Sequence, residues 1–287
     1  MRAFSTQTDL PENHMQTELI LEAGRAEGQY WRDLWRYREL LVFLAWRDIL
    51  VRYKQTVIGV MWALLRPFLM MVVFTIIFNK LARLSSDGAP YPILVFAALL
   101  PWQLFANSLT ECGNSLLGNS NLISKIYFPR LIVPASAVLV GIVDFLISFG
   151  FLILMMIWYG YAASPRMMLL PLIALPALIA ASGAGLWLAA LTVKYRDFRY
   201  VVPFLVQFGL YISPVGFSSD IVPEHWRLSY SLNPMVGVID GFRWAILSDK
   251  TELYLPGFIL SLTVGLMLFF SGIWYFRKAE RNFADII

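Results

Sequence analysis

The side chains that could carry out chemistry are few and scattered in this sequence. The two histidines, His14 and His225, lie in separate polar segments, and neither is surrounded by other metal-ligating residues. Cys112 is the only cysteine, so no internal disulfide can form. None of the six lysines follows a glycine, which excludes the glycine–lysine step of a phosphate-binding loop. The sequence therefore argues against an enzyme and predicts no cofactor or metal bound by this chain.

Three carboxylates, Glu111, Asp144 and Asp240, lie in largely apolar stretches on different segments. An ionisable group inside a membrane span is a candidate for function, and Asp144 lies mid-way through the third predicted span. The alternative is a protonated or hydrogen-bonded structural group that faces another helix, and the sequence leaves both possibilities open. Asp240 and Arg243 are three residues apart on one predicted helix, so we expect a local ion pair between them.

The composition predicts a membrane protein. The chain has 287 residues and is 59% hydrophobic and 15% aromatic, and its mean hydropathy is +0.64. Soluble domains are nearer to about 45–50% apolar. The net charge of +4 is small, and in a membrane chain the placement of Lys and Arg matters more than their sum. We therefore expect membrane lipid, and no nucleic acid, as a partner.

The apolar stretches predict an all-α membrane protein with six transmembrane helices in a domain over residues 57–276. Except for the fifth, each provides roughly the 20 residues that a helix needs to cross the hydrocarbon core. The predicted spans cover residues 57–81, 91–111, 131–159, 167–193, 200–212 and 255–276.

Basic residues predict the orientation of these spans. With the N-terminus inside, 17 Lys and Arg residues lie on the cytoplasmic side and 6 lie outside. The positive-inside rule therefore places both termini in the cytoplasm of a multi-pass membrane protein. Residues 1–28 are polar and lack an early apolar segment, so they are expected to form a flexible cytoplasmic tail and not a signal peptide. Residues 277–287 form the second cytoplasmic tail.

Residues 29–56 show helical periodicity without being apolar enough to span. Trp31 and Trp35 share one arc of the helix, while Arg32 and Arg36 lie opposite. Arg38 falls within the apolar arc, where its aliphatic stem can be buried while the charge stays in water. This pattern predicts an amphipathic helix in the membrane interface. An ordinary amphipathic helix packed on protein is the alternative.

The stretch 213–247 is too apolar for a free loop and too interrupted for one span. Its helix breakers are Pro214, Gly216, Pro223, Pro234 and Gly237. Broken helices at membrane depth are tolerated only where they are buried in protein or line a cavity. We predict two short re-entrant half-helices between spans 5 and 6, covering part of 217–231 and 234–247.

Residues 113–130, called here the coupling segment, form a polar island rich in glycine and asparagine between two apolar runs. A short helix over 121–127, capped by Asn119 or Ser120, would present Leu122, Ile123 and Ile126 as a small apolar knob. A merely solvated connecting loop is the alternative, but it does not explain so many apolar residues.

Several short motifs follow one another along the chain beyond residue 40. They are Arg52-Tyr53 with Gly59, Trp62 and Pro67; Asn119 to Lys125 with Phe128-Pro129-Arg130; Tyr195-Arg196-Asp197; Ser213-Pro214-Val215; Asn233-Pro234-Met235; Phe242-Arg243; and Phe283-Ala284-Asp285. Together they resemble the permease subunits of the type-two ATP-binding-cassette exporters of polysaccharide.

The resemblance implies a permease that dimerises with a second copy of itself and pairs with two ATPase subunits, which bind Mg-ATP. It implies a polyprenyl-diphosphate-linked polysaccharide as cargo, such as O antigen, capsule or teichoic acid, and an inner-membrane location. O antigen is favoured because the aromatic-rich outer segment and the interface helix look most like those exporters. The residues expected to couple to the ATPase are Asn119, Asn121, Leu122, Ile123, Lys125, Ile126, Phe128 and Arg130.

Three further sets of residues receive roles in this hypothesis. A collar for the anionic lipid head comprises Trp31, Trp35, Arg38, Arg52 and Lys54. An aromatic stripe that lets sugars slide through the channel comprises Tyr200, Phe204, Phe208 and Tyr211. The alternative for this stripe is helix packing or lipid contact. An outer gate comprises Pro214, Val215, Phe217, Asn233, Pro234, Met235 and Arg243.

Three rival functions remain at this point. A stand-alone channel or proton-driven carrier would need a relay of intramembrane charges, and Asp144 alone gives poor support for one. A membrane enzyme of lipid-linked sugar metabolism would need clustered catalytic side chains. The third rival is a type-two permease that exports a drug or a lipid.

Overall fold

The structure is a computed structural model, and it describes residues 27–54, 59–82, 89–247, 252–280 and 283. Residues 1–26 of the N-terminal tail expected over 1–28, the beginning of the first predicted span and most of the C-terminal tail lie outside these ranges. Within them the chain is helical and contains no β-strand. The prediction of an all-α protein is confirmed for this part of the chain.

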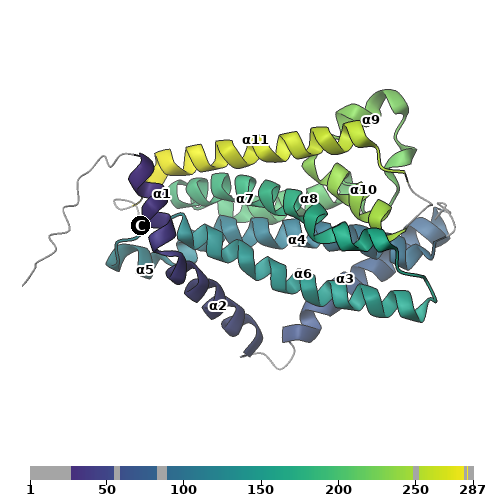
Figure 1. The fold of residues 1–287 in the computed structure, drawn as a ribbon, viewed down its shortest axis with the longest axis horizontal. Helices are drawn as coiled ribbons and strands as arrows, with labels where there is room; N and C mark the ends of the chain where they lie inside the picture. The colour runs from purple at the N-terminus through teal and green to yellow at the C-terminus, as the bar shows by residue number, and fades with distance from the viewer. Residues whose placement is uncertain (1–26, 55–58, 83–88, 248–251, 281–282, 284–287) are drawn as a thin grey trace, which may run out of the picture.

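The helices form an elongated bundle whose members run roughly along its long axis (Figure 1). One end carries α1 and the short helix α5, and the other carries α9 (Figure 1). The helices are α1 (Glu27–Arg36), α2 (Arg38–Lys54), α3 (Gly59–Phe74), η1 (Thr75–Leu81), α4 (Tyr91–Gly118), α5 (Ser120–Lys125), α6 (Ile132–Trp158), η2 (Pro165–Leu169), α7 (Leu170–Lys194), α8 (Phe198–Ile212), η3 (Ser219–Ile221), α9 (Glu224–Tyr230), α10 (Pro234–Ile246) and α11 (Leu255–Glu280).

Five helical stretches are long and apolar enough to cross a membrane. They cover Ala63–Leu81, Tyr91–Gly118, Ile132–Trp158, Pro165–Lys194 and Leu255–Glu280. Each coincides with a predicted span, although the second extends beyond its predicted end at residue 111. The fifth predicted span, over residues 200–212, corresponds to the shorter apolar helix α8, which has 15 residues. Irregular chain with Pro214 and Gly216 follows α8, so the backbone does not continue as one straight span.

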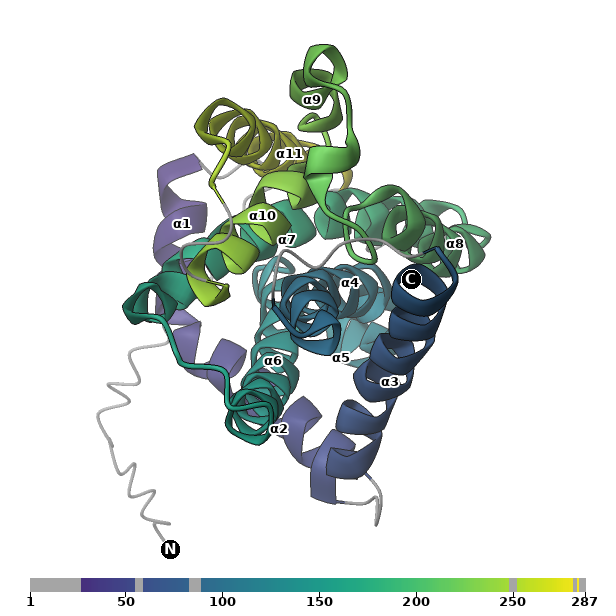
Figure 2. The ribbon, with the colours of Figure 1, turned by 90° about the vertical axis from the view of Figure 1, so that its right-hand side faces the viewer.

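Helix α4 lies at the centre of the bundle, among α3, α6, α7, α8 and α10 (Figure 2). Between Ile93 and Leu100 every residue of α4 is buried. A helix that is apolar all round needs protein or lipid on every side, and here neighbouring helices provide that cover. The chain therefore organises its other helices around α4.

The single amphipathic helix predicted over residues 29–56 is replaced, within the described residues up to Lys54, by two helices that meet at Tyr37. Helix α2 packs along α6 with Leu44 and Ala45 buried, while Phe43 and Trp46 are exposed on its other side. An exposed apolar face of this kind suits the membrane interface. The break lets α1 turn toward the end of α11 while α2 follows α6 (Figure 1).

The contact between α7 and α11 depends on two glycines. A Cβ built on Gly183 would lie 2.5 Å from the carbonyl carbon of Leu268, and one built on Gly272 would lie 2.9 Å from the carbonyl carbon of Gly183. Small residues allow helix backbones to approach this closely. Further along the same contact, the rings of Trp187 and Tyr275 stack with centroids 3.9 Å apart.

We expect Gly272→Ala to push α7 and α11 apart, because the clash is with backbone atoms that cannot rotate away. The predicted loss is about 1–3 kcal/mol of folding free energy, measured as thermal unfolding in detergent micelles. Gly150→Ala is the control, since a Cβ at Gly150 of α6 meets nothing within 4 Å. Equal stability of the two variants would show that the glycine contact does not set the spacing of these helices.

Candidate functional site

The coupling segment contains the predicted short helix, but it begins and ends earlier than expected. Helix α4 runs to Gly118, and α5 covers Ser120–Lys125. Asn119 is the N-cap residue of α5, as one of the two predicted candidates, but its side chain makes no capping hydrogen bond. Its Oδ1 accepts a hydrogen bond from Arg47 Nη2 at 2.7 Å, and its Nδ2 donates to the Ser115 carbonyl at 3.0 Å. The Asn119 side chain therefore ties α2 to the end of α4.

The apolar surface of the segment also differs from the predicted knob. Ile123 is only 7% exposed and belongs to a buried cluster with Leu44 of α2 and Phe276 of α11. Its assignment to an exposed knob is wrong, because helices distant in sequence cover it. Ile126 is 56% exposed and Tyr127 is 59% exposed. The exposed tip of the segment is therefore formed by Ile126 and Tyr127, and the sequence analysis did not single out Tyr127.

The other predicted coupling residues divide between the exposed tip and the protein interior. Asn121 and Lys125 are exposed beside Ile126, whereas Leu122 is half-buried. Phe128 is buried in the same cluster as Ile123.

Glu280, at the end of α11, holds the far end of the coupling segment. The Arg130 backbone N–H donates to its Oε1 at 2.9 Å, and Arg130 Nη1 donates to its backbone carbonyl at 2.6 Å. The Tyr30 hydroxyl of α1 donates to the second carboxylate oxygen at 3.0 Å. Burial, together with the neighbouring Glu280 carboxylate, raises the pKa of Tyr30, so this hydroxyl keeps its proton.

Three parts of the chain therefore meet at Glu280: α1, the coupling segment and α11. No sequence pattern singled out Glu280 or Tyr30, because they lie far apart in the chain. The sequence feature closest to this cluster was the motif that begins at Phe283. The Phe283 ring packs on Phe276 and lies under the Arg130 guanidinium.

Asp144 is a hydrogen-bonded group that faces two other helices. The Tyr53 hydroxyl donates to its Oδ1, and Asn107 Nδ2 donates to its Oδ2 at 3.2 Å. Arg52 Nη1 lies 3.3 Å from Asp144 Oδ2 and 3.4 Å from Glu111 Oε1. The structure therefore favours the second of the two possibilities left open for Asp144.

The predicted lipid-head collar is not one cluster. Trp31, Trp35 and Arg38 lie near the α1–α2 junction, where the Arg38 guanidinium lies 5.4 Å from the Trp35 ring centroid. Arg52 and Lys54 lie at the opposite end of the 17-residue helix α2. Arg52 faces carboxylates there, whereas Lys54 is exposed.

The aromatic stripe of α8 faces outward from the bundle. Tyr200 is 78% exposed, and Phe204, Phe208 and Tyr211 are exposed as well. The Phe204 and Phe208 rings stack with centroids 6.0 Å apart. The opposite face of α8 packs on α4, where Gly209 meets the ring of Trp102. The stripe is thus an apolar surface that no described helix of this chain covers.

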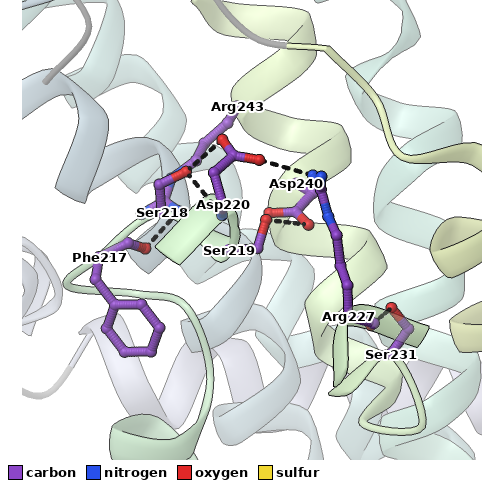
Figure 3. A network of polar contacts seen from close by, with 8 residues as sticks. All are labelled: Phe217, Ser218, Ser219, Asp220, Arg227, Ser231, Asp240 and Arg243. Atoms are coloured by element: carbon purple, nitrogen blue, oxygen red, sulfur yellow. Dashed lines mark hydrogen bonds and ion pairs between the residues drawn. The ribbon is translucent and has the colours of Figure 1, made fainter. Parts of the chain in front are cut away.

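The predicted half-helices are present as α9 and α10. Helix α9 projects from the edge of the bundle, whereas α10 packs inside it (Figure 2). The chain between α8 and α9 lies against α10 (Figure 3). Arg243, only 3% exposed, donates from Nη1 to the Phe217 carbonyl at 2.7 Å and from Nη2 to the Val215 carbonyl at 3.0 Å.

The expected hydrogen-bonded ion pair between Asp240 and Arg243 is replaced by bonds to this connecting chain. Asp240 Oδ2 accepts from the Ser219 hydroxyl at 2.8 Å, while Arg243 binds the carbonyls (Figure 3). Carbonyl oxygens near the side chain compete for the guanidinium because they lack helical partners. The expectation of an ion pair between helix positions i and i+3 considered only the two side chains and not the carbonyl oxygens of the connecting chain.

Further contacts make the outer-gate residues one packed unit. The Tyr91 hydroxyl of α4 donates to the Gly216 carbonyl at 2.5 Å. Asn233 Oδ1 accepts from the Met235 backbone N–H at 3.0 Å and so caps α10, in which Pro234 is the first residue. Asn233 Nδ2 donates to Ser213 Oγ at 2.9 Å. Pro214, Val215 and Met235 are buried.

A protein-family profile described as ABC-2 type transporter matches residues 39–247. The chain belongs to the ABC-2 type transporter family. The matched region runs from α2 through α10 and so includes the coupling segment, Asp144, α8 and the outer-gate residues.

Individual members of the ABC-2 type transporter family agree with this assignment over most of the chain. The chain is 29% identical over 256 residues to the O-antigen export system permease protein RfbA of Klebsiella pneumoniae, covering 87% of this chain and 95% of that protein. It is 27% identical over 258 residues to RfbA of Myxococcus xanthus, covering 89% and 98%. It is 25% identical over 234 residues to the polysialic acid transport protein KpsM of Escherichia coli, covering 78% and 89%.

Proposed function

We propose that this ABC-2 type chain is the channel-forming permease subunit of an ATP-driven exporter that moves lipid-linked polysaccharide across the inner membrane. The favoured cargo is O antigen, because the named O-antigen permeases match more of this chain, at higher identity, than the polysialic acid transport protein does. Capsule and teichoic acid are the alternative cargoes. The proposed assembly contains two copies of this chain, which form six spans each with both termini in the cytoplasm, and two ATPase subunits that bind Mg-ATP.

The exposed tip formed by Ile126 and Tyr127 carries the proposal. It is apolar, follows α5 at the end of the bundle that also carries α1, and is flanked by the exposed side chain of Lys125. We assign this tip to a groove on the ATPase. Aromatic and aliphatic side chains that become buried when two proteins bind contribute most of the affinity of an interface.

Movement of the tip would pass to the rest of the chain through fixed contacts. Asn119 connects the start of the segment to Arg47 of α2, and Arg130 connects its end to Glu280 of α11. A segment held at both ends transmits displacement as a rigid body. ATPase closure would therefore move α1, α2 and α11 together with the coupling segment.

The aromatic stripe of α8 supplies the proposed sliding surface for the polymer. Sugars have apolar faces, and aromatic rings bind such faces without fixing one position. The packed segment around Arg243 supplies the external gate in this proposal.

Phe204→Ala should reduce polymer export by about three- to tenfold, the loss expected for one aromatic contact of about 0.5–1.5 kcal/mol. Assembly with the ATPase should be unchanged, because Phe204 projects away from α4 and α7. Trp274→Ala on α11 is the matched control, since Trp274 is also exposed and aromatic. Unchanged export in Phe204→Ala, or equal losses in both variants, would count against a lining role.

The proposed function is tested by deleting the coding sequence of this chain and measuring where the polymer accumulates. We expect lipid-linked polysaccharide to collect inside the cell and to disappear from its surface, with recovery when the chain is restored. Normal surface polymer in the deletion strain would contradict the proposal.

A further inference from the structure

The end of α4 nearer to α5 has an unusual polar face. Five polar side chains on it are partly exposed, at the helical spacing of one face: Gln103, Asn107, Thr110, Glu111 and Asn114. Between Gln103 and Asn114 the only other partly exposed residue of α4 is Phe105. Apart from Phe105, this part of the central helix is therefore polar wherever it is accessible.

The chain's own hydrogen bonds satisfy this face only in part. Thr110 Oγ1 donates to the Ala106 carbonyl at 2.7 Å, and Asn114 Nδ2 donates to the Thr110 carbonyl at 3.0 Å. The Oδ1 atom of Asn114 is buried and has no hydrogen-bond partner among the described residues. Amide groups placed against hydrocarbon without partners cost several kcal/mol. The face therefore needs contact with something polar.

The neighbouring helices extend the polar character instead of covering it with apolar side chains. Glu111 is 45% exposed in its side chain and faces Arg52 of α2. Asn107 donates to Asp144 of α6, which also contacts Tyr53. The exposed apolar surface of α6 lies on a different side of that helix from Asp144. It begins at Leu146, two residues after Asp144.

We propose that the Gln103–Asn114 face of α4 is the wall of a water-filled passage in the cytoplasmic half of the membrane and binds hydroxyl groups of the passing sugar chain. Amide and carboxylate groups both pair with sugar hydroxyls, which donate and accept hydrogen bonds. The identity of the ligand rests on the proposed function, whereas the hydration of the face does not. Contact with a second copy of this chain is the competing explanation, and it would exclude water.

Cysteine substitution tests the hydration directly in membranes that contain the full transporter. Gln103→Cys and Asn114→Cys are treated with a negatively charged methanethiosulfonate reagent, and adducts are counted by mass spectrometry. The control is Leu146→Cys, whose position is 59% exposed on α6 but points away from the polar face. The wild-type chain gives the background, because its Cys112 is buried on the same helix.

We expect Gln103→Cys and Asn114→Cys to react at least about tenfold faster than Leu146→Cys, because the reactive thiolate forms in water and not in hydrocarbon. The wild type should acquire no adduct. No reaction at Gln103→Cys and Asn114→Cys, or equal rates at all three positions, would overturn the passage.

The sugar contact is tested on the same membranes with Gln103→Leu. We expect polymer export to fall by about tenfold, the loss of about one hydrogen bond, with ATPase copurification unchanged. Unchanged export would overturn the sugar contact. If the proposed function itself is wrong, the wild-type chain will export no polymer in the presence of ATP. That result differs from a loss of export confined to Gln103→Leu.

Discussion

Ile126→Asp is expected to abolish productive coupling while the chain still folds. The substitution puts a charge on the exposed tip, so the proposed ATPase groove would have to desolvate a carboxylate. We expect export to fall by at least about 30-fold, the effect of losing an interface anchor worth about 2 kcal/mol. The measurement pairs ATPase copurification with polymer export, and Ile126→Leu is the matched control that keeps the apolar tip.

Ile123→Asp separates coupling from folding. Its side chain is buried among Leu44 and Phe276, so the carboxylate would be placed in the protein interior. We expect less folded protein from Ile123→Asp and a normal yield from Ile126→Asp. Wild-type export by Ile126→Asp with the ATPase still bound would show that the tip is not the docking surface.

Asp144→Ala is expected to destabilise the chain by about 2–4 kcal/mol, measured as thermal unfolding in detergent. The change removes the acceptor for Tyr53 and Asn107 and one of the carboxylates that Arg52 faces. Asp144→Asn should lose about 1 kcal/mol, because the amide oxygen still accepts one of these bonds.

Export by the Asp144 variants separates a structural role from a proton relay. A structural Asp144 predicts that Asp144→Asn exports at least about one third as well as the wild type per folded molecule, since the amide keeps the shape of the carboxylate and one of its hydrogen bonds and loses only the charge that faces Arg52. Complete loss of export in a fully stable Asp144→Asn protein would point to proton transfer through this carboxylate.

Much of the helical organisation follows from local sequence. Long apolar runs produced the five spans, and the prolines and glycines between residues 213 and 247 correctly predicted two short helices in that stretch. These features depend on backbone chemistry and hydropathy within a few turns of helix.

The side-chain environment of the coupling segment was not predictable in the same way. Ile123 and Ile126 have the same chemistry in the sequence, and only α2 and α11 decide which one is buried. Glu280 meets Arg130 across 150 residues of chain, and no local pattern marks such a pair. Asn119 occupies the N-cap position that its residue type favours, but its side-chain oxygen binds Arg47 and not the backbone of α5.

The most direct test of the account uses inside-out membrane vesicles that contain this chain, its ATPase partner and lipid-linked polymer. We predict that polymer reaches the vesicle lumen only when ATP is present, and that an uncoupler of the proton gradient leaves the rate unchanged. Polymer movement driven by a proton gradient without ATP would contradict the account and would make Asp144 the first residue to study.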